Sequence, residues 1–332
     1  MRRLLRQLED LEARRAAGDV TVAGHRLHVA NLHKVFWPRL GLTKGALMRY
    51  YVRIAPYILP VVADRPLITR RYPDGVGQHA YYQQRAPEDT PPGVRVATLA
   101  SDRVVPRRFI GGSLVTLLFM TQAAAISQDP WFSRVQAEDS PDHSVLDLDP
   151  MPGVPFSTVV DVARWVRDEL DTVGIAGFPK TSGASGIHVY VPLPAGTSYE
   201  TSRLFAEVIA TLVAQKHPRV ATVERALADR GRRVYVDFLQ NTRGKTLASA
   251  YSARGVPDAG VSTPLTWKEI DAGVDRGAFT MLTIEARLRE VGDLWAALRR
   301  APAADLAAVF SARRARAAPS RRRRPPALRR AR

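Results

Sequence analysis

The sequence contains no cysteine, which excludes disulfides, thiolate metal sites and a cysteine nucleophile. It shows no secretory signal either, because its first ten residues carry charges where such a signal is apolar. The most apolar stretch, residues 113–126, is interrupted by Thr116, Thr121 and Gln122 and falls short of the roughly 20 apolar residues that cross a bilayer. We therefore expect a buried helix there and a cytoplasmic protein with no membrane partner.

Acidic residues are missing from the end of the chain. Residues 311–332 hold ten arginines and no acid, so ten of the 17 net positive charges lie there and +7 remains for the rest. Prolines in this segment break any helix. We expect residues 301–332 to form a basic, disordered tail. Such a tail condenses on any polyanion without reading its sequence, but an extension that only keeps the protein soluble has the same composition.

The most informative stretch is residues 144–150, Ser-Val-Leu-Asp-Leu-Asp-Pro. If extended, it places Leu146 and Leu148 on one face and Asp147 and Asp149 on the other, since strand side chains alternate. Two ionised carboxylates so close repel each other unless a cation binds between them, and Mg²⁺ or Mn²⁺ prefers oxygen ligands. The stretch predicts a metal site, although an exposed strand end with two solvated aspartates also fits it.

Two more predicted strands carry polar residues among apolar ones. His188 lies in the strand over residues 187–193, and Asp237 lies in the strand over residues 234–239. Three aspartates from two strands can hold two cations, which suits phosphoryl transfer. The loop of residues 181–186, Thr-Ser-Gly-Ala-Ser-Gly, offers N–H groups and hydroxyls to phosphate oxygens. A lone strand histidine or a lone glycine loop also occurs without any ligand. The three aspartates, the histidine and the glycine loop together are therefore stronger evidence for a phosphate site than any one of them.

The first part of the chain is predicted to begin with two small elements. Residues 1–19 have leucines at helical spacing between arginines and glutamates, which predicts an amphipathic helix. Residues 20–29 predict a strand or hairpin around Gly24. Thr43 is a suitable N-cap for a helix over residues 44–57.

Basic residues beside adjacent tyrosines in residues 66–84 are typical of a nucleic-acid groove, although a hairpin with packed tyrosines has the same pattern. We divide residues 20–300 into a DNA-binding part, 20–125, and a catalytic part, 126–300. In the latter, the pattern predicts helices over 158–173, 202–216, 267–272 and 284–300, and an arginine-rich helix or loop over 220–233.

In this order, the motifs resemble the polymerase domain of bacterial ligase D, in the archaeo-eukaryotic primase superfamily. The resemblance covers about His25 to Leu298 and rests on Lys34-Val-Phe-Trp-Pro38, Thr43-Lys44, Arg70–Val76, Leu146–Pro150, Thr181–His188, Val236-Asp237 with Gln240-Asn241, Gly244–Thr246 and Tyr251–Arg254. It implies an α/β (α+β) primase-polymerase fold with an antiparallel palm-like sheet, helices packed behind it and an N-terminal end-binding subdomain.

The resemblance also implies roles for single residues. The metal-binding, catalytic residues would be Asp147, Asp149 and Asp237. The incoming nucleotide would contact Ser182, His188, Lys245, Arg254 and Gln240. The 5′-phosphate of a gapped or broken end would lie against Lys34 and Lys44. The template strand would lie on Arg70, Arg71, Tyr81 and Tyr82, where the family usually has phenylalanine at the last two positions.

The function implied by the resemblance is template-directed nucleotidyl transfer that fills in or extends DNA ends in non-homologous end joining. The implied cofactors are two divalent cations, Mn²⁺ or Mg²⁺, and the substrates are nucleoside triphosphates, with a preference for ribonucleotides. The implied partners are DNA, a Ku-type end-binding protein and a separate DNA ligase, because ligase and nuclease domains fused to some relatives are absent. The reaction would take place at the bacterial nucleoid, in the cytoplasm.

Two other functions stay open. A degenerate relative would only bind 5′-phosphorylated ends, through Lys34, Lys44 and the basic tail. An Asp-x-Asp phosphatase would use Asp147 as its nucleophile, but Pro150 and the mid-chain position are unlike that class.

One departure from the family pattern is Gln128-Asp129, where many relatives have histidine. Since Asp129 supplies no positive donor, we expect altered nucleotide binding there.

Overall fold

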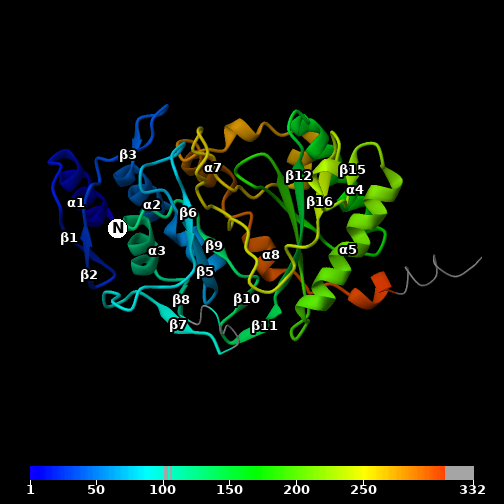
Figure 1. Cartoon of the computed structure of the whole chain (residues 1–332), viewed down its shortest axis with the longest axis horizontal. Coiled ribbons are helices and arrows are strands. Elements are labelled where there is room, and N and C mark those ends of the chain that lie inside the picture. Colours follow the sequence, from blue (N-terminus) through cyan, green and yellow to red (C-terminus); the bar gives the residue numbers. More distant parts are fainter. Residues whose placement is uncertain (101–103, 105–106, 311–332) are drawn as a thin grey trace, which may run out of the picture.

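A computed structural model describes residues 1–100, 104 and 107–310. The described residues form two halves side by side, with the N-terminal half around α1, α2 and α3 and the C-terminal half around β12, β16, α4 and α5 (Figure 1). Each half contains a five-stranded sheet. One apolar core lies in the C-terminal half, and the other fills the N-terminal half and extends to Tyr190, Tyr251 and Trp295 of the C-terminal half. In the described part of the chain, no helix is both long enough and apolar enough to span a membrane.

The N-terminal half begins with the helix and hairpin that the sequence predicts. Its first elements are α1 (Arg2–Ala13), β1 (Gly18–Val22), β2 (His25–Val29), β3 (Val35–Trp37), β4 (Leu42–Thr43) and α2 (Lys44–Val62). The Thr43 side chain accepts a hydrogen bond from the N–H of Ala46, which confirms the predicted N-cap. Helix α2 continues five residues beyond the expected end at Tyr57, through Pro60, because Ile58 and Val62 stay buried.

The sheet of this half has the strand order β6-β5-β8-β7, with β9 paired to β5. Its elements are β5 (Pro66–Arg71), β6 (Tyr81–Gln83), β7 (Val96–Thr98), β8 (Arg107–Ile110), α3 (Leu114–Gln122) and β9 (Asp129–Pro130). The apolar stretch expected to be a buried helix is α3, which packs on α2. A short ribbon of β10 (Ser133–Arg134) and β11 (Ala137–Pro141) then leads to the C-terminal half.

The C-terminal sheet has the order β13-β14-β12-β16-β15, and all its pairs are antiparallel except β15 with β16. Its strands are β12 (His143–Pro150), β13 (Phe178–Thr181), β14 (Ile187–Pro192), β15 (Ala221–Thr222) and β16 (Val234–Asp237). Helices α4 (Phe156–Asp171) and α5 (Tyr199–Lys216) cover one face, against which Leu146, Leu148 and Val236 are buried. This arrangement is the predicted α/β fold, an antiparallel sheet with helices packed behind it.

The last part of the chain differs from the prediction in three places. It contains η1 (Leu227–Asp229), α6 (Trp267–Ala272), η2 (Arg276–Ala278), α7 (Ile284–Val291) and α8 (Ala296–Arg300). The single helix expected over 284–300 is wrong, because Gly292, with φ of 69°, ends α7. Of the helix or loop expected over residues 220–233, the helix is wrong, because these residues form a loop that holds only a short edge strand and a 3₁₀ turn.

The third difference concerns the disordered tail expected from residue 301. It is wrong for residues 301–310, since Ala304 and Val309 are buried in the core of the C-terminal half. The N–H of Ala304 also donates to the carbonyl of Pro192 on β14, at 2.9 Å. The rest of the expected tail, residues 311–332, lies outside the described residues.

Candidate active site

The three aspartates converge on the sheet face opposite α4 and α5. Asp147 on the central strand β12 pairs in register with Asp237 on β16 on one side and with His188 on β14 on the other. Asp149 follows two residues later and therefore points to the same face. One carboxylate oxygen from each aspartate lies within 4.8 Å of the others. The convergence predicted from the alternating pattern is therefore present.

The acidic cluster is buried, and burial sets its charge. Asp147 is 3% exposed, and its burial, reinforced by the nearby Asp237, raises its pKa to about 7. Burial also raises the pKa of Asp149 to about 7, with repulsion from Asp147 and Asp237 adding to it. Without a cation, these two carboxylates therefore keep protons up to about neutral pH, because Lys180 and Arg254 offset only part of the cost of their charge.

One oxygen of the cluster is left without a donor. His188 Nε2 lies 3.2 Å from Asp147 Oδ1, but not in line for a hydrogen bond, and within the described part of the chain this buried oxygen accepts none. A buried acceptor of this kind costs free energy unless a ligand satisfies it. Three carboxylates are the donors that a hard divalent cation prefers, so the residues present fit such an ion.

Asp237 is held in place by its neighbours. Its Oδ1 accepts hydrogen bonds from the N–H of Leu239, at 2.7 Å, and from the Tyr235 hydroxyl, at 3.2 Å. Its Oδ2 accepts from Gln240 Nε2, at 3.0 Å. The carboxylate is therefore oriented before any ligand binds.

The glycine loop between β13 and β14 is tightly packed. The Ser182 hydroxyl accepts hydrogen bonds from the N–H groups of Ala184 and Gly186, at 3.1 and 2.9 Å. Two of the N–H groups that we expected to face a phosphate are thus used inside the loop. Gly183 has φ of +73°, and a Cβ there would lie 2.6 Å from the backbone nitrogen of Ser262, so only glycine fits.

Lys180 is a site residue to which the sequence reasoning assigned no role. It lies opposite His188 in the β13–β14 register, is fully buried, and places Nζ 2.8 Å from His188 Nδ1. The same Nζ donates to the Ser262 hydroxyl, at 2.6 Å, and to the Ala248 carbonyl, at 2.9 Å. Burial lowers the pKa of both Lys180 and His188. The available signal was a lysine inside an otherwise buried strand, directly before the glycine loop.

Arg254 and Asp129 lie on the same side of the cluster. Arg254 donates to the Ser182 carbonyl, at 2.7 Å. Asp129 accepts from the Ser127 hydroxyl, at 2.7 Å, and burial raises its pKa, an effect that the positive charges of Arg254 and Lys180 oppose. Asp129 thus adds a carboxylate whose charged form is stabilised by Arg254 and Lys180.

The predicted nucleotide-binding residues fall into two groups. Ser182, His188 and Arg254 lie on the β14 side of Asp147, as described above. Lys245 and Gln240 instead line a pocket of about 390 Å³ on the β16 side of Asp237. Arg225 and Arg230, which the sequence reasoning did not single out, line the same pocket, and Arg230 stacks 3.6 Å over the Tyr235 ring.

In the N-terminal half, the two candidate 5′-phosphate residues are neighbours. The N–H of Lys44 donates to the Lys34 carbonyl, at 2.8 Å. The Lys34 ammonium pairs with Asp74, at 2.8 Å, whereas Lys44 is 5% exposed and donates to the Gln122 carbonyl. Burial, reinforced by the charge of Lys34, lowers the pKa of Lys44 to about 8.

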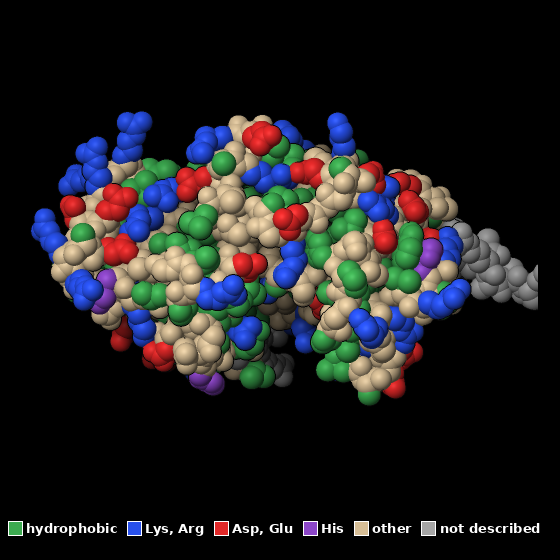
Figure 2. Space-filling model, turned by 90° about the horizontal axis from the view of Figure 1, so that it is seen from above, with side chains coloured by type: hydrophobic (Ala, Val, Ile, Leu, Met, Phe, Trp, Pro, Cys, Tyr) green, Lys and Arg blue, Asp and Glu red, His purple; other side chains and the backbone are tan. Residues whose placement is uncertain are grey.

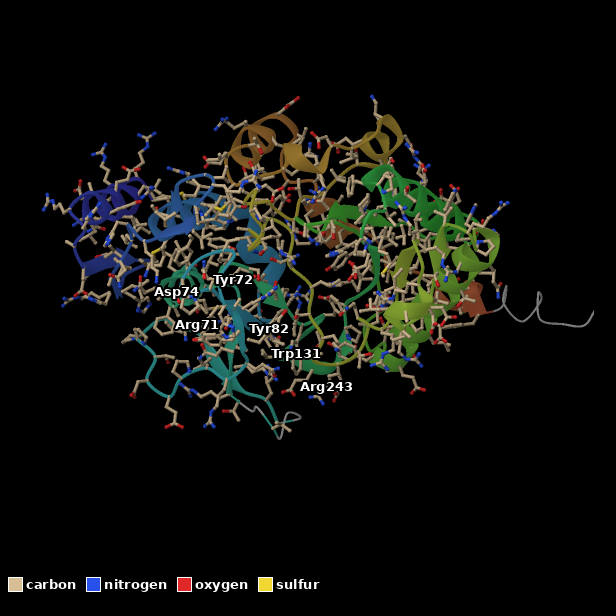
Figure 3. All side chains as sticks on the ribbon, turned by 45° about the horizontal axis from the view of Figure 1, so that its top comes forward. Arg71, Tyr72, Asp74, Tyr82, Trp131 and Arg243 are labelled. Carbon is tan, nitrogen blue, oxygen red and sulfur yellow. The ribbon has the colours of Figure 1, made fainter. Side chains whose placement is uncertain are left out.

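The candidate template surface lies on β5 and β6. Tyr82 and Tyr81 are 64% and 39% exposed, and the guanidinium groups of Arg70 and Arg71 lie over their rings at 5.6 and 5.5 Å, respectively. Arg71 also donates to Gln83 and to the Ala123 carbonyl, so it holds the sheet together. Figure 3 shows Arg71 and Tyr82 on this sheet, with Trp131 and Arg243 beyond them; the Arg243 guanidinium lies 5.7 Å from the centre of the Trp131 ring.

This arrangement defines a class of protein. A mostly antiparallel sheet whose neighbouring strands bring three carboxylates together, beside buried and exposed basic residues, is the arrangement of a nucleotidyltransferase. Comparison with known families makes the assignment specific. The family described as the LigD primase-polymerase domain matches residues 43–295, and the chain belongs to this family.

Several known proteins are similar to this chain. It is 33% identical over 254 residues to a multifunctional non-homologous end joining DNA repair protein LigD of Mycobacterium tuberculosis, and 30% identical over 268 residues to a bifunctional non-homologous end joining protein LigD of Bacillus subtilis. These alignments cover 74% and 80% of this chain but only 34% and 43% of the relatives. The chain therefore spans less than half the length of these relatives.

A solved structure is also similar. The polymerase domain from Mycobacterium tuberculosis ligase D, in complex with DNA, matches with a TM-score of 0.76 and 30% sequence identity. The match covers 84% of this chain and 100% of that structure. The predicted fold and family are thereby confirmed.

Proposed function

We propose that this protein is a template-directed nucleotidyltransferase that fills in or extends DNA ends in non-homologous end joining. The observation that carries the proposal is the convergence of Asp147, Asp149 and Asp237, from strands far apart in the sequence, within 4.8 Å of one another. Membership of the LigD primase-polymerase family supports the reaction type.

The aspartates would hold two divalent cations, Mg²⁺ or Mn²⁺, with Asp147 and Asp149 shared between both and Asp237 nearer the primer end. When bound, such cations supply positive charge to the attacking and leaving oxygens of an in-line displacement at phosphorus. The orphaned oxygen of Asp147 and the raised pKa values of Asp147 and Asp149 support this reading. The fixed orientation of Asp237 means that the chain does not reorganise this ligand on binding.

The incoming triphosphate would lie along the β14 side of the cluster. His188 is positioned there by Lys180, and Arg254 is positioned by its hydrogen bond to the Ser182 carbonyl, so both present fixed donors to phosphate oxygens. The Ser182 hydroxyl keeps its own proton to donate, because its oxygen accepts from the loop. Lys245 and Gln240, which line the pocket beyond Asp237, would contact the nucleotide or primer from the other side.

DNA would be held by the N-terminal half. Lys34 and Lys44 would bind the 5′-phosphate of a gapped or broken end, and Arg70, Arg71, Tyr81 and Tyr82 would carry the template strand. The exposed Tyr82 ring, with Arg70 over it, is the kind of platform on which unpaired bases stack. A Ku-type end-binding protein and a separate ligase at the bacterial nucleoid would complete the repair reaction.

Primer extension tests the proposal. A primer annealed to a template with a 5′-phosphorylated gap is incubated with nucleotides and Mn²⁺, and extension is followed for the wild type, Asp147→Ala, Asp237→Ala and the control Asp258→Ala, whose aspartate is exposed. We expect both site variants to lose extension by several orders of magnitude and the control to keep it. Full extension by either site variant rejects the assignment, and a wild type that binds the DNA but never extends it is only an end-binding module.

A further inference from the structure

Helix α1 presents a row of arginines to solvent. At about 100° of rotation per residue, Arg2, Arg3, Arg6 and the C-cap residue Arg14 fall within about 120° of the helix circumference, opposite the buried Leu4 and Leu8. We call these four side chains the α1 arginine face. All four are exposed, and Asp10 is the one acidic residue within that arc.

The α1 arginine face is unpaired. The ion pairs at this end of the molecule join Arg49 on α2 to Glu9 and Glu12 of α1. Among the described residues, no carboxylate forms a salt bridge with a member of the face. Figure 2 shows Lys and Arg side chains gathered at the end of the molecule that α1 occupies. This surface therefore carries four arginine charges that form no salt bridge with the described residues, with Asp10 as the one acidic residue among them.

Helix α1 is fixed to the candidate 5′-phosphate site. Its Glu12 accepts hydrogen bonds from Arg49 and from the hydroxyl of Thr43, the N-cap of α2. The next residue, Lys44, is hydrogen-bonded to the backbone of Lys34. The packing is close, because a Cβ at Gly45 would overlap the Glu12 carboxylate. The C-terminal end of α1 is thus held against Thr43, the residue before Lys44.

The face fits one kind of partner. A helix of 12 residues is a rigid rod about 18 Å long, which matches about five base pairs of duplex DNA. Guanidinium groups bind phosphate oxygens well, and duplex DNA presents phosphates along a regular line. The exposed arginines of α1 therefore complement a DNA backbone, and the lysine pair lies beyond the C-terminal end of the same helix.

We propose that the α1 arginine face binds the phosphate backbone of the duplex that lies beyond the 5′-phosphate. This inference rests on the proposed function, since it takes Lys34 and Lys44 as the site of that phosphate. It adds a surface that lies before residues 43–295, the part that matches the family. Binding there is independent of sequence and depends on the length of the duplex arm.

The test is equilibrium DNA binding by the full chain without nucleotide, measured by fluorescence anisotropy over a range of salt. The test variant is Arg2→Gln, Arg3→Gln and Arg6→Gln combined. A matched control combines Arg219→Gln, Arg289→Gln and Arg300→Gln, which removes equal charge from exposed sites elsewhere. Two gapped substrates carry either a long duplex arm beyond the 5′-phosphate or an arm cut to about three base pairs and closed by a hairpin loop.

On the long arm, we expect the test variant to lose about 2–3 from the slope of log affinity against log salt, and about a hundredfold in affinity near physiological salt. On the short arm, it should bind like the wild type, and the control should match the wild type on both. An unchanged slope overturns the proposal, as does an equal loss in the control or an equal loss on both arms. Because the readout needs no incorporation, a protein that binds in this way but never extends a primer refutes only the proposed polymerase activity.

Discussion

Replacing Asp147 with asparagine should make the metal-free protein more stable, not less. Asn keeps the shape of the side chain but carries no charge, and the oxygen that it replaces accepts no hydrogen bond from the described residues. Asp147 is buried beside Asp237, so in the folded state its ionised form is disfavoured. The variant therefore removes a cost and loses little in return.

The size of this effect follows from the pKa. A rise from 3.8 to about 7 corresponds to about 4 kcal/mol at 1.4 kcal/mol per pKa unit. Because the folded state holds the proton more tightly than the unfolded state, the cost is absent below the unfolded pKa of 3.8 and grows as pH rises. It is complete above about pH 7, so the variant should gain about 4 kcal/mol at pH 8 and less than half of that at pH 5.

Chemical denaturation in EDTA at these two pH values measures the effect, with Asp258→Asn as the exposed control. The wild type should lose stability between the two pH values, whereas the variant should lose less. Adding Mn²⁺ should then stabilise the wild type by about 2.7 kcal/mol at a hundredfold excess over its dissociation constant, and the variant by less. A variant that is less stable than the wild type in EDTA at the higher pH would show that Asp147 is not under electrostatic strain.

Three further predictions follow from single contacts. Tyr82→Ala should leave thermal stability unchanged, because the ring is exposed, but should weaken binding of an unpaired template base by about 1–3 kcal/mol. The control is Tyr82→Phe, which keeps the ring. Equal template affinity in the two variants would show that Tyr82 is not part of the template surface. The preference for 5′-phosphorylated over 5′-hydroxyl gaps should fall up to about tenfold per pH unit above about pH 8, because Lys44 loses its proton there. Lys44→Arg should abolish this decline, since arginine keeps its charge. A preference that does not depend on pH would show that Lys44 does not bind the 5′-phosphate. Asn241→Ala should cost about 3 kcal/mol in urea unfolding, because its buried amide bonds both the N–H and the carbonyl of Val145; a loss below about 1 kcal/mol would contradict that account.

The sequence was most informative where neighbours along the chain decide the structure. Alternation along β12 was enough to separate Asp147 and Asp149 from Leu146 and Leu148, because successive side chains of a strand point to opposite faces. The Thr43 cap was equally local, since its hydroxyl bonds a backbone group three residues on. Ordered motifs also led to the correct family.

Partners across the sheet were harder to foresee. Lys180 was passed over because its role depends on the register that sets it opposite His188, and on Ser262 and Ala248, which come from a distant segment. The Ser182 oxygen accepts hydrogen bonds from its own loop, so two N–H groups expected to face a phosphate are used there instead. The end of α7 at Gly292 was missed because the helical pattern of apolar residues continues beyond it.

By itself, then, the sequence determined which side chains share a face, where helices begin and to which family the chain belongs. Only the tertiary structure decided which distant residues meet, how deeply Asp147 and Lys44 are buried, and that α1 is fixed beside the lysine pair. The physical reason is that alternation and capping depend on a few adjacent residues. Register, burial and the resulting pKa shifts depend instead on contacts between segments that lie far apart along the chain.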